Sequence, residues 1–212
     1  MIILGLTGSI GMGKSTTAKM FLEAGIPVYD ADATVHALYE GKATPLVEEA
    51  FPGTTDGKIV DRKKLGDKVL ADPEALKKLE KIIHPLVHAE QQKFIEAART
   101  SGAKLVLLDI PLLFEGGRET SVDAVIVVTA SEEEQRKRVL SRPGMSEEKF
   151  ANILKKQVPD AIKRKKADFL IDTGEGMEAA RQKVAEIIDM VSVENFQPIN
   201  RELSSAEEQN HA

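Results

Sequence analysis

The residues with the clearest chemistry form a glycine-rich segment near the N-terminus, GSIGMGKS at residues 8–15, which fits the pattern G-x-x-x-x-G-K-[ST]. It follows the apolar run IILGLT at residues 2–7 and precedes a segment with helical character. A strand, a glycine turn and a helix N-terminus in this order aim backbone N–H groups and the positive end of the helix dipole at one point. Such a point suits a polyphosphate. A glycine turn that only caps a helix is the alternative, but the full pattern in this context favours nucleotide binding.

The side chains of this segment have separate expected roles. Lys14 can reach the β- and γ-phosphates of a nucleotide, and the Ser15 hydroxyl can bind Mg²⁺. Glycines let the backbone approach the phosphates because no Cβ stands in the way. The residues expected to bind the nucleotide are Gly8, Gly11, Met12, Gly13, Lys14, Ser15 and Thr16.

Carboxylates close two other apolar, strand-like runs. Asp30 and Asp32 follow residues 26–29, and Asp109 ends the run LVLL at residues 105–108. In parallel α/β sheets ligands gather at the carboxyl ends of strands, so these carboxylates are expected to face the same crevice as the phosphate-binding loop. Either of the first two can serve as an acid or base, or one of them caps the next helix. Asp109 is expected to be a second Mg²⁺ partner, usually through water, with a turn or cap residue as the alternative.

Residues 131–166 are the most charged part of the chain and are predicted to form helices around a Pro-Gly turn. Such a segment can act as a lid. Arg138 and Arg142 are the arginines expected to stabilise the negative charge of phosphoryl transfer, with a solvated basic face as the competing account. The basic run at residues 163–166 is expected to be a solvated helix end.

The elements that must position these residues are predicted from hydrophobic periodicity. Five β-like runs alternate with helices, which predicts an α/β fold with a parallel sheet of about five strands between two helical layers. A core with the phosphate-binding loop is expected at residues 1–32, 102–130 and 167–194, and a helical substrate subdomain at 33–101. A lid is expected at residues 131–166 and a flexible tail at 195–212.

His84 lies before Pro85 in the helical insertion. Because proline disfavours helical geometry in the preceding residue, a bend is predicted here between a helix over residues 73–83 and another running to about residue 98. A lone histidine near such a bend is more often structural than a ligand contact.

Composition narrows the class of protein. The chain has 212 residues, a net charge of -5 and no cysteine, so disulfides, thiolate metal sites and general nucleic-acid binding are not expected. Nothing in it resembles a transmembrane span. A cytoplasmic enzyme without a membrane or nucleic-acid partner is the expectation.

The layout favours a small-molecule kinase, since the chain lacks the Asn-Lys-x-Asp element of a GTP-binding switch. The chain closely resembles the dephospho-CoA kinase family over about residues 1–191. The segments that carry the resemblance are residues 6–15, GIPVYDAD at 25–32, HPLV at 84–87, PLLFE at 111–115 and the lid from 138 to 157. The phosphate-binding loop alone is shared by many families, whereas the other segments in this order are specific.

The resemblance implies transfer of the ATP γ-phosphate to the ribose 3′-hydroxyl of dephospho-CoA, giving CoA and ADP, with Mg²⁺. It implies Asp32 as catalytic base, Lys14 and Arg138 as further catalytic residues, and Arg142 as a lid contact to ATP. The residues implied on the substrate side are Thr7, Asp32, His84, Pro111, Leu112, Leu113 and Glu115.

Two positions depart from the family pattern. Ile153 stands where members often have arginine, and Thr173 follows Asp172 where members often have asparagine. Lys155 or Lys156 is a candidate replacement for the missing arginine. A nucleoside monophosphate kinase of adenylate-kinase type and a non-catalytic nucleotide-binding module are the alternative functions, and a monomer is the favoured state.

Overall fold

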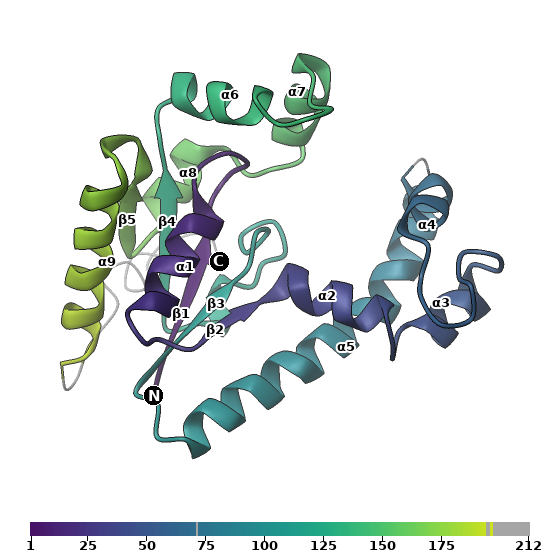
Figure 1. Ribbon diagram of the computed structural model, residues 1–212, viewed down its shortest axis with the longest axis horizontal. Helices are drawn as coiled ribbons and strands as arrows, with labels where there is room; N and C mark the ends of the chain where they lie inside the picture. The colour runs from purple at the N-terminus through teal and green to yellow at the C-terminus, as the bar shows by residue number, and fades with distance from the viewer. Residues whose placement is uncertain (71, 194–195, 197–212) are drawn as a thin grey trace, which may run out of the picture. The chain divides into compact units, whose positions relative to one another are not determined.

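The computed structural model describes residues 1–70, 72–193 and 196 (Figure 1). It divides into two compact units. The first contains Met1–Tyr29 and the described residues from Ser101 onward, and the second is Asp30–Thr100. The tail predicted at residues 195–212 lies outside the described residues, apart from residue 196.

The five predicted strands are confirmed and form one sheet in the order β2-β3-β1-β4-β5. Strand β1 pairs with β3 and with β4, and β4 pairs with β5, all in parallel. The strands are β1 (Ile2–Thr7), β2 (Val28–Asp30), β3 (Leu105–Asp109), β4 (Ala124–Thr129) and β5 (Phe169–Asp172). Because β1 and β3 are neighbours in parallel register, the ends of both strands meet at the same edge of the sheet.

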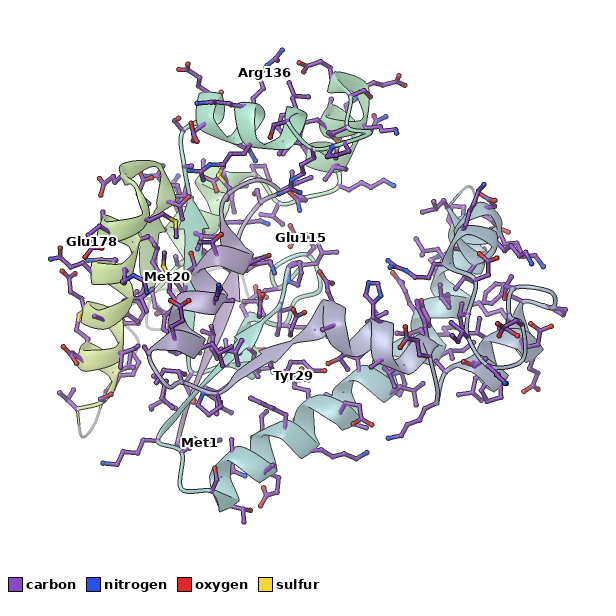
Figure 2. All side chains as sticks on the ribbon, in the orientation of Figure 1. Met1, Met20, Tyr29, Glu115, Arg136 and Glu178 are labelled. Carbon is purple, nitrogen blue, oxygen red and sulfur yellow. The ribbon has the colours of Figure 1, made fainter. Side chains whose placement is uncertain are left out.

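Helices cover both faces of this sheet, which explains why every residue of β3 and β4 is buried. Helices α1 (Lys14–Glu23) and α9 (Met177–Val191) lie side by side on one face, and α8 (Asp160–Lys166) packs on β4 (Figure 1). Met20 of α1, labelled in Figure 2, belongs to the core between the helices and the sheet. The three-layer α/β prediction is therefore confirmed.

The segment after β4 is helical, as predicted. Helix α6 (Glu132–Leu140) begins at Ser131, whose hydroxyl accepts the Glu134 N–H, and α7 (Glu147–Lys155) begins at Ser146, whose hydroxyl accepts the Lys149 N–H. Two short 3-10 helices, Glu119–Ser121 and Thr173–Glu175, complete the unit.

One expectation for this segment is wrong. The run at residues 163–166 is not wholly solvated, because Lys163 is completely buried. It lies on the side of α8 that packs on the sheet, where its Nζ is 2.8 Å from Glu115 Oε1. A buried charge of this kind is tolerated only with such a partner.

The second unit has its own core beneath α2 (Ala31–Tyr39), α3 (Thr44–Ala50) and α4 (Arg62–Val69), which pack on α5 (Pro73–Thr100). The helix boundary predicted at His84-Pro85 is wrong, since α5 is one helix of 28 residues with Pro85 inside it. Its buried residues include Leu79, Ile83 and Val87, spaced by four. Burial of this stripe stabilises a continuous helix and outweighs the local preference of the residue before proline.

None of the helices in the described part of the chain combines the length and apolarity that a membrane crossing requires.

Candidate active site

The phosphate-binding loop has the predicted setting between a strand and a helix. β1 ends at Thr7, residues 8–13 form the loop, and α1 begins at Lys14. The exposed Ser15 and Thr16 stand in the first turn of α1, where the orphan N–H groups of the helix lie. This arrangement offers a binding point for an anion.

Two loop glycines are required by the close approach of other elements. Gly11 has φ +80°, and a Cβ atom on it would lie 2.5 Å from Val139 Cγ2 and 3.1 Å from the Gln135 carbonyl oxygen, both on α6. Gly13 has φ +91°, and its Cβ would lie 3.0 Å from Thr173 Cγ2. Only glycine combines this backbone with such contacts. The loop is therefore packed directly against α6 and against the turn after β5.

Lys14 and Asp109 are in contact. Lys14 Nζ lies 2.6 Å from Asp109 Oδ1, with side chains that are 16% and 4% exposed. Asp109 pairs in register with Leu6 at the end of β1, which explains why the carboxylate meets the loop. The predicted convergence of Asp109 with the phosphate-binding loop is a feature of the structure.

Arg138 is held beside the loop by Thr173. Its Nε donates to Glu134 at 2.9 Å, its Nη1 to Thr173 Oγ1 at 2.7 Å and its Nη2 to the Thr173 carbonyl at 2.9 Å. The Thr173 hydroxyl is also 2.9 Å from the Met12 carbonyl oxygen of the loop. Thr173, one of the two positions that depart from the family pattern, thus joins Arg138 to the phosphate-binding loop. Its position directly after β5 was the only sequence signal for this role.

A cavity of about 290 Å³ brings the loop, the two arginines and α9 together. Its lining residues are Gly11, Gly13, Thr16, Thr17, Met20, Arg138, Arg142, Thr173, Gly176, Met177 and Ala180. Backbone N–H groups and guanidinium groups at one cavity suit a ligand that carries phosphates.

The other candidates of the first unit follow β3. The buried Thr7 donates its hydroxyl to the Pro111 carbonyl oxygen at 3.0 Å. Leu113 is completely buried, whereas Leu112 is 51% exposed. Glu115, labelled in Figure 2, accepts the Val158 N–H at 2.9 Å besides pairing with Lys163. Of this group, Leu112 is the residue whose side chain is open to a ligand.

Asp30, Asp32 and His84 belong to the second unit. Asp30 is the N-cap of α2, since its side chain accepts the Ala33 N–H at 2.9 Å. Asp32 is exposed in the first turn of the same helix, and His84 is exposed on α5. The capping alternative therefore applies to Asp30 and leaves Asp32 available for chemistry.

Metal binding has few protein ligands to use. The residues that the structure describes contain no group of three or more histidine, cysteine, aspartate or glutamate side chains arranged to hold a metal ion.

Lys155 and Lys156, the candidate replacements for the arginine expected at position 153, are exposed at the end of α7.

A parallel sheet of this order with a phosphate-binding loop, flanking helices and a helical insertion defines a kinase of the P-loop class. The family model described as dephospho-CoA kinase matches residues 2–178. A dephospho-CoA kinase of Mesorhizobium japonicum is 64% identical over 189 residues, which are 89% of this chain and 96% of that protein. The chain belongs to the dephospho-CoA kinase family.

Solved structures agree with this assignment. The protein TT1252 from Thermus thermophilus is 34% identical with a TM-score of 0.80, and the match covers 91% of this chain and 98% of that one. A dephospho-CoA kinase from Campylobacter jejuni is 28% identical with a TM-score of 0.64, over 90% and 97% of the two chains. The chain is accordingly an ATP-dependent kinase, a phosphotransferase that acts on an alcohol.

Proposed function

We propose that this chain transfers the γ-phosphate of ATP to the ribose 3′-hydroxyl of dephospho-CoA, giving CoA and ADP. The observation that carries this proposal, beyond membership of the family, is the cavity lined by loop glycines, Thr16, Arg138 and Arg142. Phosphoryl transfer needs positioning and charge stabilisation far more than covalent chemistry by the protein. The N-terminal turn of α1 and two guanidinium groups at one cavity supply both.

On the nucleotide side, the backbone of residues 8–16 and the Lys14 ammonium neutralise the phosphates of ATP. Arg138 adds charge stabilisation when negative charge spreads over the transferred group, and its double contact with Thr173 lowers the cost of orienting it. Arg142 lines the same cavity and contacts the nucleotide.

On the acceptor side, Asp32 accepts the proton of the attacking hydroxyl. The proposal is supported by the division of roles in α2, where Asp30 makes the capping hydrogen bond and Asp32 stays exposed. A carboxylate that orients a hydroxyl and takes its proton is the usual base of phosphoryl transfer.

The remaining acceptor contacts are assigned to His84 and to residues 111–115. His84 and Leu112 are exposed and can touch the substrate directly. Thr7, Leu113 and Glu115 engage other parts of the protein, so their proposed contribution is to shape the segment that carries Leu112.

The residues of this site fit a Mg²⁺ ion that takes only one or two of its ligands from the protein. Ser15 supplies an exposed hydroxyl in the first turn of α1, and Asp109 supplies a carboxylate at the end of β3. Mg²⁺ in such enzymes keeps several waters and binds the nucleotide phosphates, so one or two protein oxygens suffice. When bound, the ion would neutralise negative charge on the nucleotide phosphates.

A coupled assay for ADP tests the proposal. Wild-type protein with ATP and Mg²⁺ is given dephospho-CoA, AMP, CMP or dTMP in parallel reactions. ADP formation that depends on dephospho-CoA and is absent with the monophosphates is the expected result. Turnover with a nucleoside monophosphate instead would support the adenylate-kinase-like alternative, and ATP binding without turnover would support a non-catalytic module. A monomeric state and a cytoplasmic location stay predictions.

A further inference from the structure

Both backbone polar groups of Ile10, in the phosphate-binding loop, are bound by glutamine side chains from the segment after β4. The Ile10 N–H donates to Gln157 Oε1 at 3.0 Å, and the Ile10 carbonyl accepts from Gln135 Nε2 at 2.8 Å. The partners lie 147 and 125 residues away in the chain. Neither bond belongs to the strand or helix that flanks the loop.

Each glutamine is itself held in place. Gln135 is 5% exposed, and its backbone N–H donates to the Ser131 carbonyl at 2.9 Å in the first turn of α6. The Gln157 N–H donates to the Leu154 carbonyl at 3.1 Å, and the next residue, Val158, donates to Glu115 Oε1 at 2.9 Å. With the backbone of each glutamine fixed in this way, only the side-chain torsions must be ordered when the amide bonds the loop.

The consequence concerns the shape of the loop. Residues 8–13 bind phosphates through backbone N–H groups, and such binding is strongest when the groups already point at the ligand. Hydrogen bonds to the N–H and to the carbonyl of Ile10 restrict its two backbone dihedral angles. Val139 and Gln135 of α6 lie so close to Gly11 that a Cβ atom there would contact them. The segment 131–166 therefore constrains the loop at two consecutive residues.

We infer that Gln135 and Gln157 are positioning residues that hold the phosphate-binding loop in its binding shape and link it to the lid segment. This inference rests on the proposed function only in taking the loop as the site of the nucleotide phosphates. It assigns no contact between either glutamine and the substrates.

Isosteric variants test it. Gln135→Met and Gln157→Met keep the side-chain length and remove the amide. Binding of ATP and of adenosine to the full chain is measured by calorimetry, together with kcat and KM for ATP. Each variant is expected to weaken ATP binding about three- to tenfold, from the loss of one hydrogen bond, and to leave adenosine affinity unchanged. Gln182→Met, at an exposed glutamine of α9 bonded to Glu186, is the matched control and should bind both ligands normally.

The double variant adds a second readout. Because the two glutamines hold one residue, the combined loss in ATP affinity should be smaller than the product of the separate losses. Unchanged ATP affinity in both single variants, or equal losses for ATP and adenosine, would overturn the inference.

A measurement on the wild-type protein keeps the inference testable if the variants fold poorly. Amide hydrogen exchange followed by NMR should show the Ile10 N–H exchanging at least about tenfold more slowly than an unprotected amide. Unprotected exchange at Ile10 would refute the bond to Gln157. Neither the exchange nor the binding assay needs an acceptor substrate, so a failed assay with dephospho-CoA would count against the proposed function and leave this test intact.

Discussion

The ammonium of Lys14 and the carboxylate of Asp109 form an ion pair of 2.6 Å between the phosphate-binding loop and the end of the neighbouring strand. The Asp109 side chain is 4% exposed, so solvent screens this pair little. One carboxylate thus orients Lys14 and is also the proposed Mg²⁺ partner.

Asp109→Asn should separate the two roles of this carboxylate. We expect the free energy of unfolding to fall by about 1–3 kcal/mol because Lys14 loses its charged partner. Turnover should fall about tenfold or more, and the Mg²⁺ concentration for half-maximal rate should rise. Asp123→Asn is the control, since Asp123 accepts the Ile3 N–H at the other end of the sheet. It should alter stability without changing the Mg²⁺ requirement, and an unchanged requirement in Asp109→Asn would remove Asp109 from the metal site.

Asp32→Asn should leave ATP affinity near normal and reduce turnover by roughly a hundredfold or more, because the hydroxyl loses its proton acceptor. Steady-state kinetics with ATP titration by calorimetry measure both. Asp30→Asn is the matched control in the same motif, since asparagine caps helices about as well as aspartate. Near-normal turnover in Asp32→Asn would exclude this residue as the base.

Gly11→Ala should move the loop away from α6, because the new Cβ would meet Val139 Cγ2 at 2.5 Å. We expect a loss of about 1–3 kcal/mol in the free energy of unfolding and weaker ATP binding. Gly25→Ala separates backbone strain from this clash. Gly25 has φ +84° and nothing within 4 Å of an added Cβ, so this variant should lose about 1 kcal/mol and bind ATP normally. The same ATP affinity in both variants would contradict the account.

Lys163→Met should destabilise the first unit by about 2–4 kcal/mol, because Glu115, whose side chain is only 13% exposed, keeps its charge without its partner. Glu115→Gln in the same chain should recover part of this loss, which urea denaturation of the single and double variants would measure as a coupling energy. The exposed Lys165 offers a control, and Lys165→Met should stay within about 0.5 kcal/mol of wild type. Additive effects of the two substitutions would refute the pairing.

Glu48 should make the stability of the second unit depend on pH. The Gly53 N–H and the Thr55 hydroxyl, with distances of 2.7 and 2.8 Å to the carboxylate, lower the pKa of Glu48 below its usual range. The stabilisation is therefore complete above the pKa of the unfolded chain and is lost as the pH falls through the lower pKa of the folded protein. Glu48→Gln should lower the Tm at pH 7, and the difference from wild type should shrink in acid. Glu49→Gln, at the exposed neighbour, should show no such difference at either pH.

The positions of the helices and strands follow closely from local sequence. The apolar runs at residues 2–7 and 105–109 are strands with those bounds. These runs are apolar because both faces of a parallel sheet are covered, so burial and strand formation leave the same signal. The helix boundary predicted at His84-Pro85 failed because the apolar stripe of α5 outweighs a preference between adjacent residues.

The sequence by itself determined the kind of chemistry: a glycine loop with Lys14 and Ser15, a strand that ends in Asp109, and arginines at 138 and 142. These signals are local, because each depends on residue types within one turn or one strand end. Only the tertiary structure decided that Thr173 binds Arg138 and that Lys163 is buried against Glu115. The hydrogen bonds of Gln135 and Gln157 to Ile10 were likewise visible only in the structure. Such pairings join residues far apart in the chain. The sequence around a polar side chain does not indicate whether that side chain bonds water or another segment of the protein.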